Sequence, residues 1–251
     1  MARTNWTRNE LIVAFNLYCK IPFGKIHIRN PEIISLASML GRTPSAVSWK
    51  LANFASLDPS LKKRNIAGAT HGGKLEKEVW QEFNEDWERL SFESEALRQQ
   101  MRGQLAVEED DQLFPEGRTR DAVVRTRVNQ GFFRAAVLAA YNSTCCITGL
   151  AVGELLNASH IVPWSMDIKN RTNPRNGLCL NAIHDRAFDR GFLTITTDYA
   201  VQLSPRIKNE ADRGLESLIQ RYEGTKISVP ERFAPDIQFL QYHHQNVFLR
   251  Y

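Results

Sequence analysis

The chain has few cysteines, no long apolar run and no large net charge. Four cysteines in 251 residues are too few for the disulfide framework of a small secreted domain, and the adjacent Cys145 and Cys146 cannot easily bridge each other. No apolar run approaches the ~18 residues that a membrane-spanning helix requires. A formal net charge of +4 is modest. We therefore expect a globular protein with free thiols and no membrane partner.

The N-terminal segment MARTNWTRNELIV also lacks an apolar stretch followed by a small-residue cleavage site, so we expect a cytoplasmic protein. Apolar residues make up 43% of the chain and charged residues 24%, which is typical of proteins with a packed core. A length of 251 residues allows one large domain or two of ordinary size, and we expect two.

Charge is unevenly distributed along the chain. Residues 103–116 contain five acidic residues and no basic one, and with Pro115 and Gly117 they predict a linker over residues 103–117. This linker separates a domain over residues 1–102 from one over residues 118–251. Residues 42–64 and 118–134 each carry a net charge of +4. Two basic segments suit a protein that touches a polyanion at two places, although ordinary solvated faces give the same pattern.

The first domain is predicted to be all-helical. A capping-box pattern at Thr7 and Glu10 starts a helix that ends near Pro22, and Pro31 and Pro44 suit the first positions of two more helices. Residues 75–101 are predicted to be largely helical, with an aromatic stripe that is most simply explained by core packing. The members of this stripe are Trp80, Phe83 and Trp87.

The second and third helices resemble a helix-turn-helix. Gly41 supplies the turn, small Ala37 lies four residues before it and Val47 six residues after it, and this spacing lets the second helix pack closely on the first. A plain helical hairpin would fit the same pattern. If the motif reads DNA, these residues face a groove or its phosphates: Arg42, Thr43, Ser45, Ser48, Trp49 and Lys50.

Two further basic groups are candidate phosphate contacts. Lys62, Lys63 and Arg64 begin a basic, glycine-bearing loop that we expect to be exposed. Arg125, Arg127 and Arg134 lie at or just before a helix predicted over residues 129–141. These three arginines either clamp phosphates or form surface ion pairs, and the sequence leaves both possibilities open.

Chemistry-bearing residues concentrate in residues 156–191, LNASHIVPWSMDIKNRTNPRNGLCLNAIHDRAFDRG. His160 stands in an apolar segment that predicts a strand, and Asn176-Gly177 predicts a turn into the second strand of a hairpin. The amide of Asn176 can bridge the loop and hold His160 in orientation. A short helix then carries three candidate metal ligands, namely His184, Asp185 and Asp189.

These residue types suit phosphodiester hydrolysis. The reaction needs a base to activate the nucleophile, a cation to neutralise charge on the phosphate and stabilisation of the leaving oxygen. The imidazole of His160 titrates near neutral pH and can act as the base. Asp185 and Asp189 are four residues apart and share a helix face, and carboxylate ligands suit Mg²⁺ or Mn²⁺. Chance acidic residues on a surface helix are the alternative.

Four segments together resemble the HNH, or ββα-metal, endonucleases of bacterial restriction systems: CCITGL, ASHIVPW, NPRNGLCLN and HDRAFDRG. The resemblance covers about residues 125–203. It implies an α+β fold, with a ββα-metal nuclease domain after the N-terminal helical domain. It also implies that His160 is the base, that Asn176 organises the site and that Asp185 takes the helical metal position, with Asp189 as a second ligand.

The chain departs from this family in two places. Many relatives carry a metal ligand directly before the base, whereas this chain has Ser159. Many relatives also brace the site with a four-cysteine zinc knuckle, but Gly149 and Asn181 stand where two of those cysteines are expected. We therefore expect no structural zinc, and we expect Cys146 and Cys179 to be buried packing residues.

The resemblance implies a metal-dependent DNA endonuclease that leaves 5′-phosphate and 3′-hydroxyl ends. It also implies a restriction enzyme, with DNA that carries 5-methyl or 5-hydroxymethyl cytosine as an expected target. Its partner would be double-stranded DNA, cut by a homodimer. The alternative is a DNA-binding regulator whose HNH-like module is no longer catalytic.

The rest of the C-terminal domain carries no motif that we can interpret. Residues 192–195 and 201–203 predict a hairpin, and a later helix is predicted around Leu215 to Tyr222. His243 and His244 have no partner motif, so we expect them to be tail residues.

Overall fold

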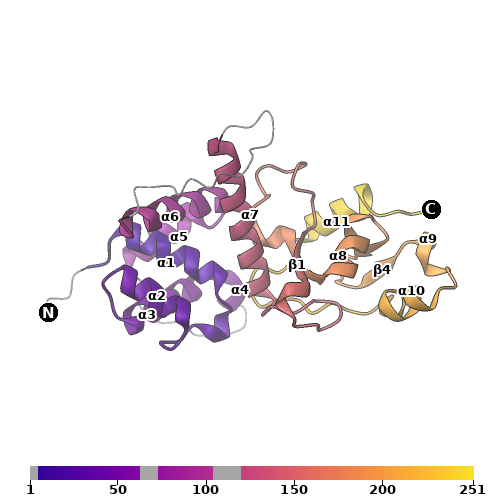
Figure 1. The fold of residues 1–251 in the computed structure, drawn as a ribbon, viewed down its shortest axis with the longest axis horizontal. Coiled ribbons are helices and arrows are strands. Elements are labelled where there is room, and N and C mark those ends of the chain that lie inside the picture. The colour runs from indigo at the N-terminus through magenta and orange to yellow at the C-terminus, as the bar shows by residue number, and fades with distance from the viewer. Residues whose placement is uncertain (1–4, 63–72, 104–119) are drawn as a thin grey trace. The chain divides into compact units, whose positions relative to one another are not determined.

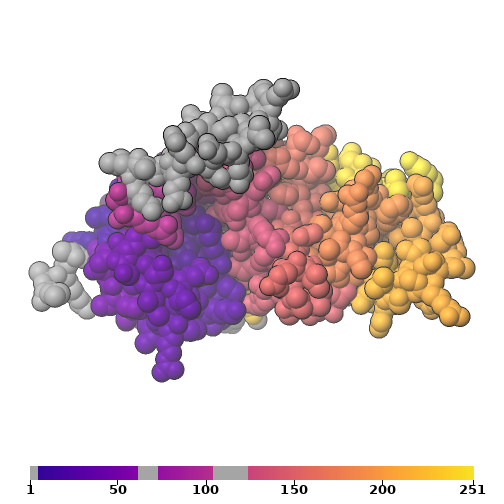
Figure 2. All heavy atoms as spheres, in the orientation of Figure 1, coloured from indigo at the N-terminus to yellow at the C-terminus, as the bar shows by residue number. Residues whose placement is uncertain are grey.

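The computed structural model of the protein describes residues 5–62, 73–103 and 120–251. Apart from Gly103, the predicted acidic linker lies outside these ranges. The chain forms two compact units, residues 1–135 and 136–251, with their boundary inside helix α7 (Figure 1). The same colours mark residue number in the space-filling view (Figure 2). Within the described ranges, no helix is both long enough and apolar enough to cross a bilayer.

The first unit is built from helices, as the sequence predicts. Its elements are α1 (Arg8–Lys20), a 3₁₀ turn η1 (Phe23–Lys25), α2 (Pro31–Met39), α3 (Pro44–Leu57), α4 (Pro59–Lys62), α5 (Lys74–Phe83), α6 (Trp87–Met101) and most of α7 (Arg120–Ala140). The predicted capping box of α1 is confirmed, because the Thr7 side chain and the Glu10 side chain each bond to the other's backbone N–H.

Helix α1 forms the centre of this unit, and every residue from Leu11 to Cys19 is buried. Phe15 lies at the middle of an aromatic cluster, with its ring centroid 4.9 Å from that of Phe54, 5.1 Å from Trp80 and 6.4 Å from Trp87. The predicted core role of the aromatic stripe is therefore confirmed. A turn at residues 84–86 divides the predicted long helix, and the Asp86 side chain caps the second helix by accepting from Arg89 N.

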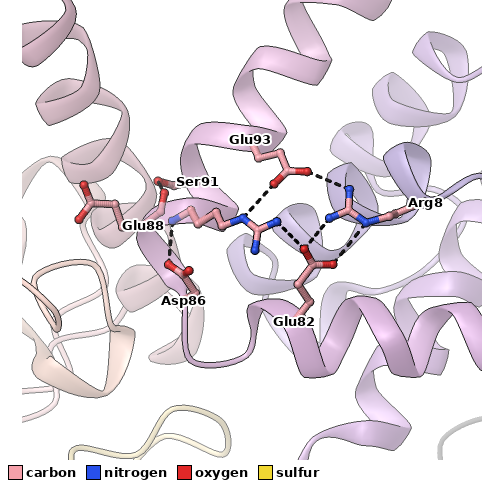
Figure 3. A network of polar contacts seen from close by, with 7 residues as sticks. Arg8, Glu82, Asp86, Glu88, Ser91 and Glu93 are labelled. Atoms are coloured by element: carbon pink, nitrogen blue, oxygen red, sulfur yellow. Dashed lines mark hydrogen bonds and ion pairs between the residues drawn. The ribbon is translucent and has the colours of Figure 1, made fainter.

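An ion-pair network ties the start of α1 to α5 and α6 (Figure 3). Arg8 lies 2.6 Å from Glu82 and 3.0 Å from Glu93, and Arg89 contacts the same two carboxylates. Each carboxylate therefore binds two guanidinium groups. Single exposed ion pairs contribute little to stability, but four charges in one network hold each other in place.

The N-terminal part of α7 packs on α6. Asn129 is buried and accepts a 2.6 Å hydrogen bond from Ser91 Oγ, and the Phe132 ring stacks on Trp87 at 6.4 Å. These contacts explain why the boundary between the two units falls at residues 135–136, whereas the sequence places the start of the second domain at residue 118.

The second unit combines two small antiparallel hairpins with short helices. Its elements are the turn η2 (Gly153–Leu155), β1 (Leu156–His160), η3 (Pro174–Asn176), β2 (Gly177–Asn181), α8 (Ala182–Asp189), β3 (Leu193–Ile195), β4 (Val201–Leu203), α9 (Pro205–Lys208), α10 (Arg213–Leu218), η4 (Gln220–Tyr222) and α11 (Ile237–Asn246). The predicted β3–β4 hairpin is confirmed. The predicted helix around Leu215 to Tyr222 is divided into α10 and η4.

The expectation that His243 is a tail residue is wrong, because His243 lies in the core of the second unit. Its side chain is buried, Nδ1 lies 2.8 Å from Thr194 Oγ1, and Nε2 lies 3.2 Å from the Phe188 carbonyl oxygen. Its ring stacks on Phe188 at 3.7 Å. Burial lowers the pKa of His243 to about 4, so the ring is neutral near pH 7. His243 thus attaches α11 to α8 and β3.

The segment after α11 also packs tightly against the end of α8. Gly191 adopts a left-handed conformation with φ +71°, and a Cβ there would collide with the Val247 carbonyl group. Its own carbonyl oxygen accepts a 3.0 Å hydrogen bond from Leu249 N. Only glycine fits both the φ angle and this close approach.

Candidate active site

The candidate site is built on one continuous β1–β2–α8 unit. Strands β1 and β2 are antiparallel, with Leu156 opposite Asn181 and His160 opposite Gly177. Helix α8 follows β2 directly, because the Asn181 side chain caps it by accepting from Ile183 N and His184 N. Helix α8 packs against both strands, and Figure 1 shows it beside β1. The strand pairing and the packing of α8 therefore bring together residues that lie up to 33 positions apart.

His160 ends β1 and is held by the loop that follows it. Its Nε2 lies 2.9 Å from the carbonyl oxygen of Arg171, and its ring packs edge-on against Trp164 at 5.5 Å. A carbonyl oxygen only accepts, so Nε2 carries the proton of the neutral ring and Nδ1 is the basic nitrogen. Burial lowers the pKa of His160. The Arg171 carbonyl group and the Asp185 carboxylate raise this pKa, but burial has the larger effect. The ring is therefore neutral at pH 7, as a general base must be.

Asn176 braces the loop after His160. Its side chain is fully buried, and its Oδ1 accepts a 2.8 Å hydrogen bond from Val162 N. Its Nδ2 donates to the carbonyl oxygens of Val162 at 3.1 Å and Asn170 at 3.4 Å. Its own carbonyl oxygen accepts from Ile161 N at 3.0 Å. One amide thus satisfies both backbone groups of the residue two positions after His160, which is the bridging geometry that the sequence predicts.

Asp185 lies in the first turn of α8 and faces β1. Its Oδ2 accepts a 2.7 Å hydrogen bond from Asn157 Nδ2, which fixes the carboxylate. Asn157 is not among the residues that the sequence indicates, because its role depends on the pairing of β1 with the helix. The Asp185 carboxylate is close enough to His160 to favour the protonated form of that ring.

Asp189 lies one turn further along α8 and is exposed. Partial desolvation and the neighbouring Asp185 carboxylate raise its pKa, while Arg186 and Arg190 lower it to a smaller extent. The effect of Asp185 on this pKa means that the two carboxylates repel each other. The expected common helix face is consistent with this repulsion.

These two carboxylates form a donor set that suits a hard divalent cation. Mg²⁺ and Mn²⁺ take oxygen ligands and normally keep several waters, so two carboxylates are a sufficient protein contribution. A cation there would also relieve the repulsion between Asp185 and Asp189. Among the residues that the structure describes, no group of three or more His, Cys, Asp or Glu side chains is placed to hold a metal.

His184 points to a different part of the unit from its neighbour Asp185. Its side chain is buried, Nε2 lies 2.8 Å from the Leu218 carbonyl oxygen, and Nδ1 lies 3.1 Å from Asn181 Nδ2. Its ring also packs edge-on against Tyr222. Because both ring nitrogens already have partners, the prediction of His184 as a metal ligand is corrected to a structural role.

A polar cluster surrounds the start of α8, and its residues form two pairs with the same spacing, Cys145 with Thr148 and Asn181 with His184. Asn181 Nδ2 lies 3.8 Å from Cys145 Sγ, 3.5 Å from Thr148 Oγ1 and 3.1 Å from His184 Nδ1. The resemblance to zinc-knuckle relatives predicts the first pair one residue later, at Cys146 and Gly149. Hydrogen bonds therefore connect residues 145–148 to the start of α8.

Burial raises the pKa of the Cys145 thiol, but hydrogen bonds from His184, Thr148 and the backbone outweigh this effect and bring the pKa to about 6. Cys146 and Cys179 are buried, as the sequence predicts. Ser159, which precedes the base, is 2% exposed, and its hydroxyl has no hydrogen-bond partner among the described residues.

Two of the predicted DNA contacts are engaged inside the first unit. Arg42 lies 2.7 Å from Glu10 and stacks over the Trp6 ring at 4.4 Å. Lys50 forms an ion pair with the buried carboxylate of Glu76. These internal pairs stabilise the helical unit, so Arg42 and Lys50 are corrected to structural residues.

The other predicted contacts on this helical pair are differently placed. Gly41 has a φ of +61° between α2 and α3, as the predicted turn requires. Thr43 caps α3 by accepting from Ala46 N, Ser45 is exposed, Ser48 is half-buried, and Trp49 is 61% exposed. The exposed surface at the start of α3 is therefore polar with one large aromatic ring.

The remaining predicted phosphate contacts lie in two places. The side chain of Lys62 and the whole of Lys63 and Arg64 lie outside the described residues. Arg125, Arg127 and Arg134 are exposed on α7, and Arg125 stacks over the Phe92 ring at 4.5 Å. The three arginines share the helix with the Asn129 and Phe132 contacts to α6.

Residues 145–196 match the family model of the HNH endonucleases. This segment, about a fifth of the chain, contains β1, β2 and α8 with His160, Asn176, Asp185 and Asp189. No curated protein matches the chain. The match supports an HNH nuclease, and hence a hydrolase that acts on DNA and typically uses a divalent metal. The sequence resemblance is thereby confirmed at this level.

Proposed function

We propose that the protein is a metal-dependent DNA endonuclease whose active site is formed by His160, Asn176, Asp185 and Asp189. The observation that carries the proposal is the position of His160, a neutral imidazole held through Nε2 beside a carboxylate-bearing helix, inside the segment that matches the HNH endonucleases. Neither a plain surface hairpin nor a DNA-binding scaffold requires this arrangement.

Each residue has a separate task in this reaction. His160 Nδ1 accepts a proton from the water that attacks phosphorus, and its Nε2–H bond to Arg171 fixes the ring orientation. Asn176 keeps the loop after His160 in position. Asp185 and Asp189 would hold Mg²⁺ or Mn²⁺, which supplies charge neutralisation at the phosphate and the leaving 3′ oxygen. The products are then a 5′-phosphate and a 3′-hydroxyl.

The test is cleavage of supercoiled plasmid by the full chain with Mg²⁺, with Mn²⁺ and with a chelator, followed by mapping of the ends. Asp185→Ala should abolish cleavage, while Asp198→Ala, which removes an exposed acid of the β3–β4 turn, should cut like the wild type. Cleavage that persists in the chelator, or in Asp185→Ala, would contradict the metal assignment. Tight DNA binding without any cleavage would instead favour a DNA-binding regulator.

The same plasmids test the finer parts of the proposal, a restriction role and a preference for modified cytosine. Plasmid carrying 5-methyl or 5-hydroxymethyl cytosine should be cut faster than plain plasmid, and equal rates would remove that preference. A single site cuts one strand, so we propose that a homodimer cuts both strands of the duplex. Linear product should then increase with the square of protein concentration at low concentration.

The α2–α3 pair is proposed to read the DNA as a helix-turn-helix. The exposed start of α3 supports this, since Ser45, Ser48 and Trp49 remain available after the internal pairing of Arg42 and Lys50. Trp49→Ala should weaken duplex binding measured by anisotropy. Because its side chain is 61% exposed, the change should leave the unfolding free energy nearly unaffected.

A further inference from the structure

A pocket of about 780 Å³ opens beside α8 in the second unit. Ile183, Phe192 and Leu249 contribute to its mainly apolar wall, and three arginines also line it, namely Arg186, Arg190 and Arg206. The volume lies in the range of about 300–1,000 Å³ that is usual for pockets that take organic ligands. Nothing in the proposed hydrolytic reaction uses this pocket.

The three arginines form no close ion pair with any carboxylate that the structure describes. Within the described ranges, none of them forms an ion pair, whereas Arg175 pairs with Asp236 at 3.1 Å and Lys208 with Glu223 at 2.7 Å in the same unit. Arg206 instead lies over the Phe192 ring at 5.8 Å. A pocket with an apolar wall and unpaired guanidinium groups suits a ligand that combines a flat apolar body with an anion. Guanidinium groups bind phosphate oxygens in a bidentate manner.

The pocket adjoins the proposed active site along α8. Arg186 and Arg190 each follow one of the two carboxylates, Asp185 and Asp189, by one position, so they lie about 100° further round the helix. A DNA strand with its scissile phosphate at Asp185 would therefore pass close to the pocket.

We propose that this pocket binds one unpaired nucleotide of the substrate strand, with its base against Ile183, Phe192 and Leu249 and its phosphates on the three arginines. The proposal rests on the proposed DNA endonuclease function. Nucleotide units carry a flat base and an anionic phosphate, and the energetic cost of unpairing is smallest where the base is already bulged or mismatched. Base stacking and arginine contacts are the usual means of holding such a nucleotide.

The experiment uses the full chain with His160→Ala, in Ca²⁺, so that DNA is bound but not cut. Two short duplexes carry a single 2-aminopurine, either fully paired or as a one-base bulge. We expect the bulged duplex to bind about tenfold more tightly, with a change in 2-aminopurine fluorescence on binding. Ile183→Asp should abolish both effects, because it places a negative charge on the pocket wall.

Matched controls separate the pocket from general changes in charge and folding. Ile183 is 47% exposed and Val152 is 45% exposed, so Val152→Asp introduces the same charge at similar exposure outside the pocket. Arg206→Ala is a second pocket variant, and Arg213→Ala is its control at an exposed arginine that does not line the pocket. Both pocket variants should lose the preference for the bulge, and both controls should keep it.

Equal affinity for the two duplexes, or the same loss in Ile183→Asp and Val152→Asp, would overturn the pocket assignment. Cleavage by the wild type would remain a separate result, so the nuclease proposal could stand while the pocket proposal fails. Binding of a polyglutamate peptide that Ile183→Asp removes, without any effect on the bulged duplex, would assign the pocket to an acidic protein partner and overturn the proposal.

Discussion

Replacing Asn176 by alanine should damage both the stability and the activity of the second unit. The side chain is fully buried and pairs with both backbone groups of Val162, which is itself 4% exposed. Asn176→Ala leaves a buried N–H and a buried carbonyl oxygen without partners, at roughly 1–3 kcal/mol each. For the two groups together we therefore expect a loss of about 2–6 kcal/mol in the free energy of unfolding.

The activity should fall through a different route. Val162 is two residues after His160, so a loosened loop displaces the base from the attacking water. A misplacement of about 1 Å costs on the order of 10²-fold in rate. Asn176→Asp should be nearly as damaging, because it keeps an acceptor for Val162 N but sets an oxygen against the Val162 carbonyl oxygen.

The assay combines urea unfolding, followed by tryptophan fluorescence, with the rate of plasmid nicking. Lys169→Ala is the control, since Lys169 is exposed on the same loop and should change stability by less than about 0.5 kcal/mol. If Asn176→Ala matched Lys169→Ala in both stability and rate, the bracing role of Asn176 would be refuted.

Two further predictions concern ionisable groups outside the site. The pKa of His243 is about 4 in the folded chain and about 6.5 in the unfolded chain, so between these pH values only the unfolded chain binds a proton there. As the pH is lowered from about 6.5 to 4, the free energy of unfolding should therefore decrease by up to about 3 kcal/mol. His243→Gln should lack this part of the pH dependence, and parallel pH curves for the two proteins would disprove the assignment. Lys50→Met leaves Glu76, which is 2% exposed, without its cation and should cost about 3 kcal/mol in urea unfolding. The double variant Lys50→Met with Glu76→Gln should recover much of the lost unfolding free energy and should bind DNA as the wild type does. Weaker DNA binding by this double variant would instead show that Lys50 contacts DNA.

Local sequence signals predicted several elements correctly. The capping box at Thr7 and Glu10, the helix-starting prolines Pro31 and Pro44, and the β3–β4 hairpin all depend on neighbouring residues, and each is present in the structure. The positions of His160 and Asn176 in a strand and at a hairpin were also predictable, because turn residues and apolar runs specify them.

Long-range contacts account for what the sequence did not reveal. His243 becomes a core residue only through Phe188 and Thr194, about fifty positions away. Asn157 acquires its role through Asp185, which reaches it only after the strands pair. Arg42 and Lys50 look like DNA contacts in sequence, and only the fold supplies the carboxylates that pair with them.

The central claim is that His160 is the base that activates water. The direct measurement is the single-turnover cleavage rate of His160→Ala, at saturating protein with Mg²⁺ or Mn²⁺, compared with that of the wild type. We predict a rate lower by about 10² to 10⁴, with DNA affinity retained. Cleavage by His160→Ala at the wild-type rate would contradict it.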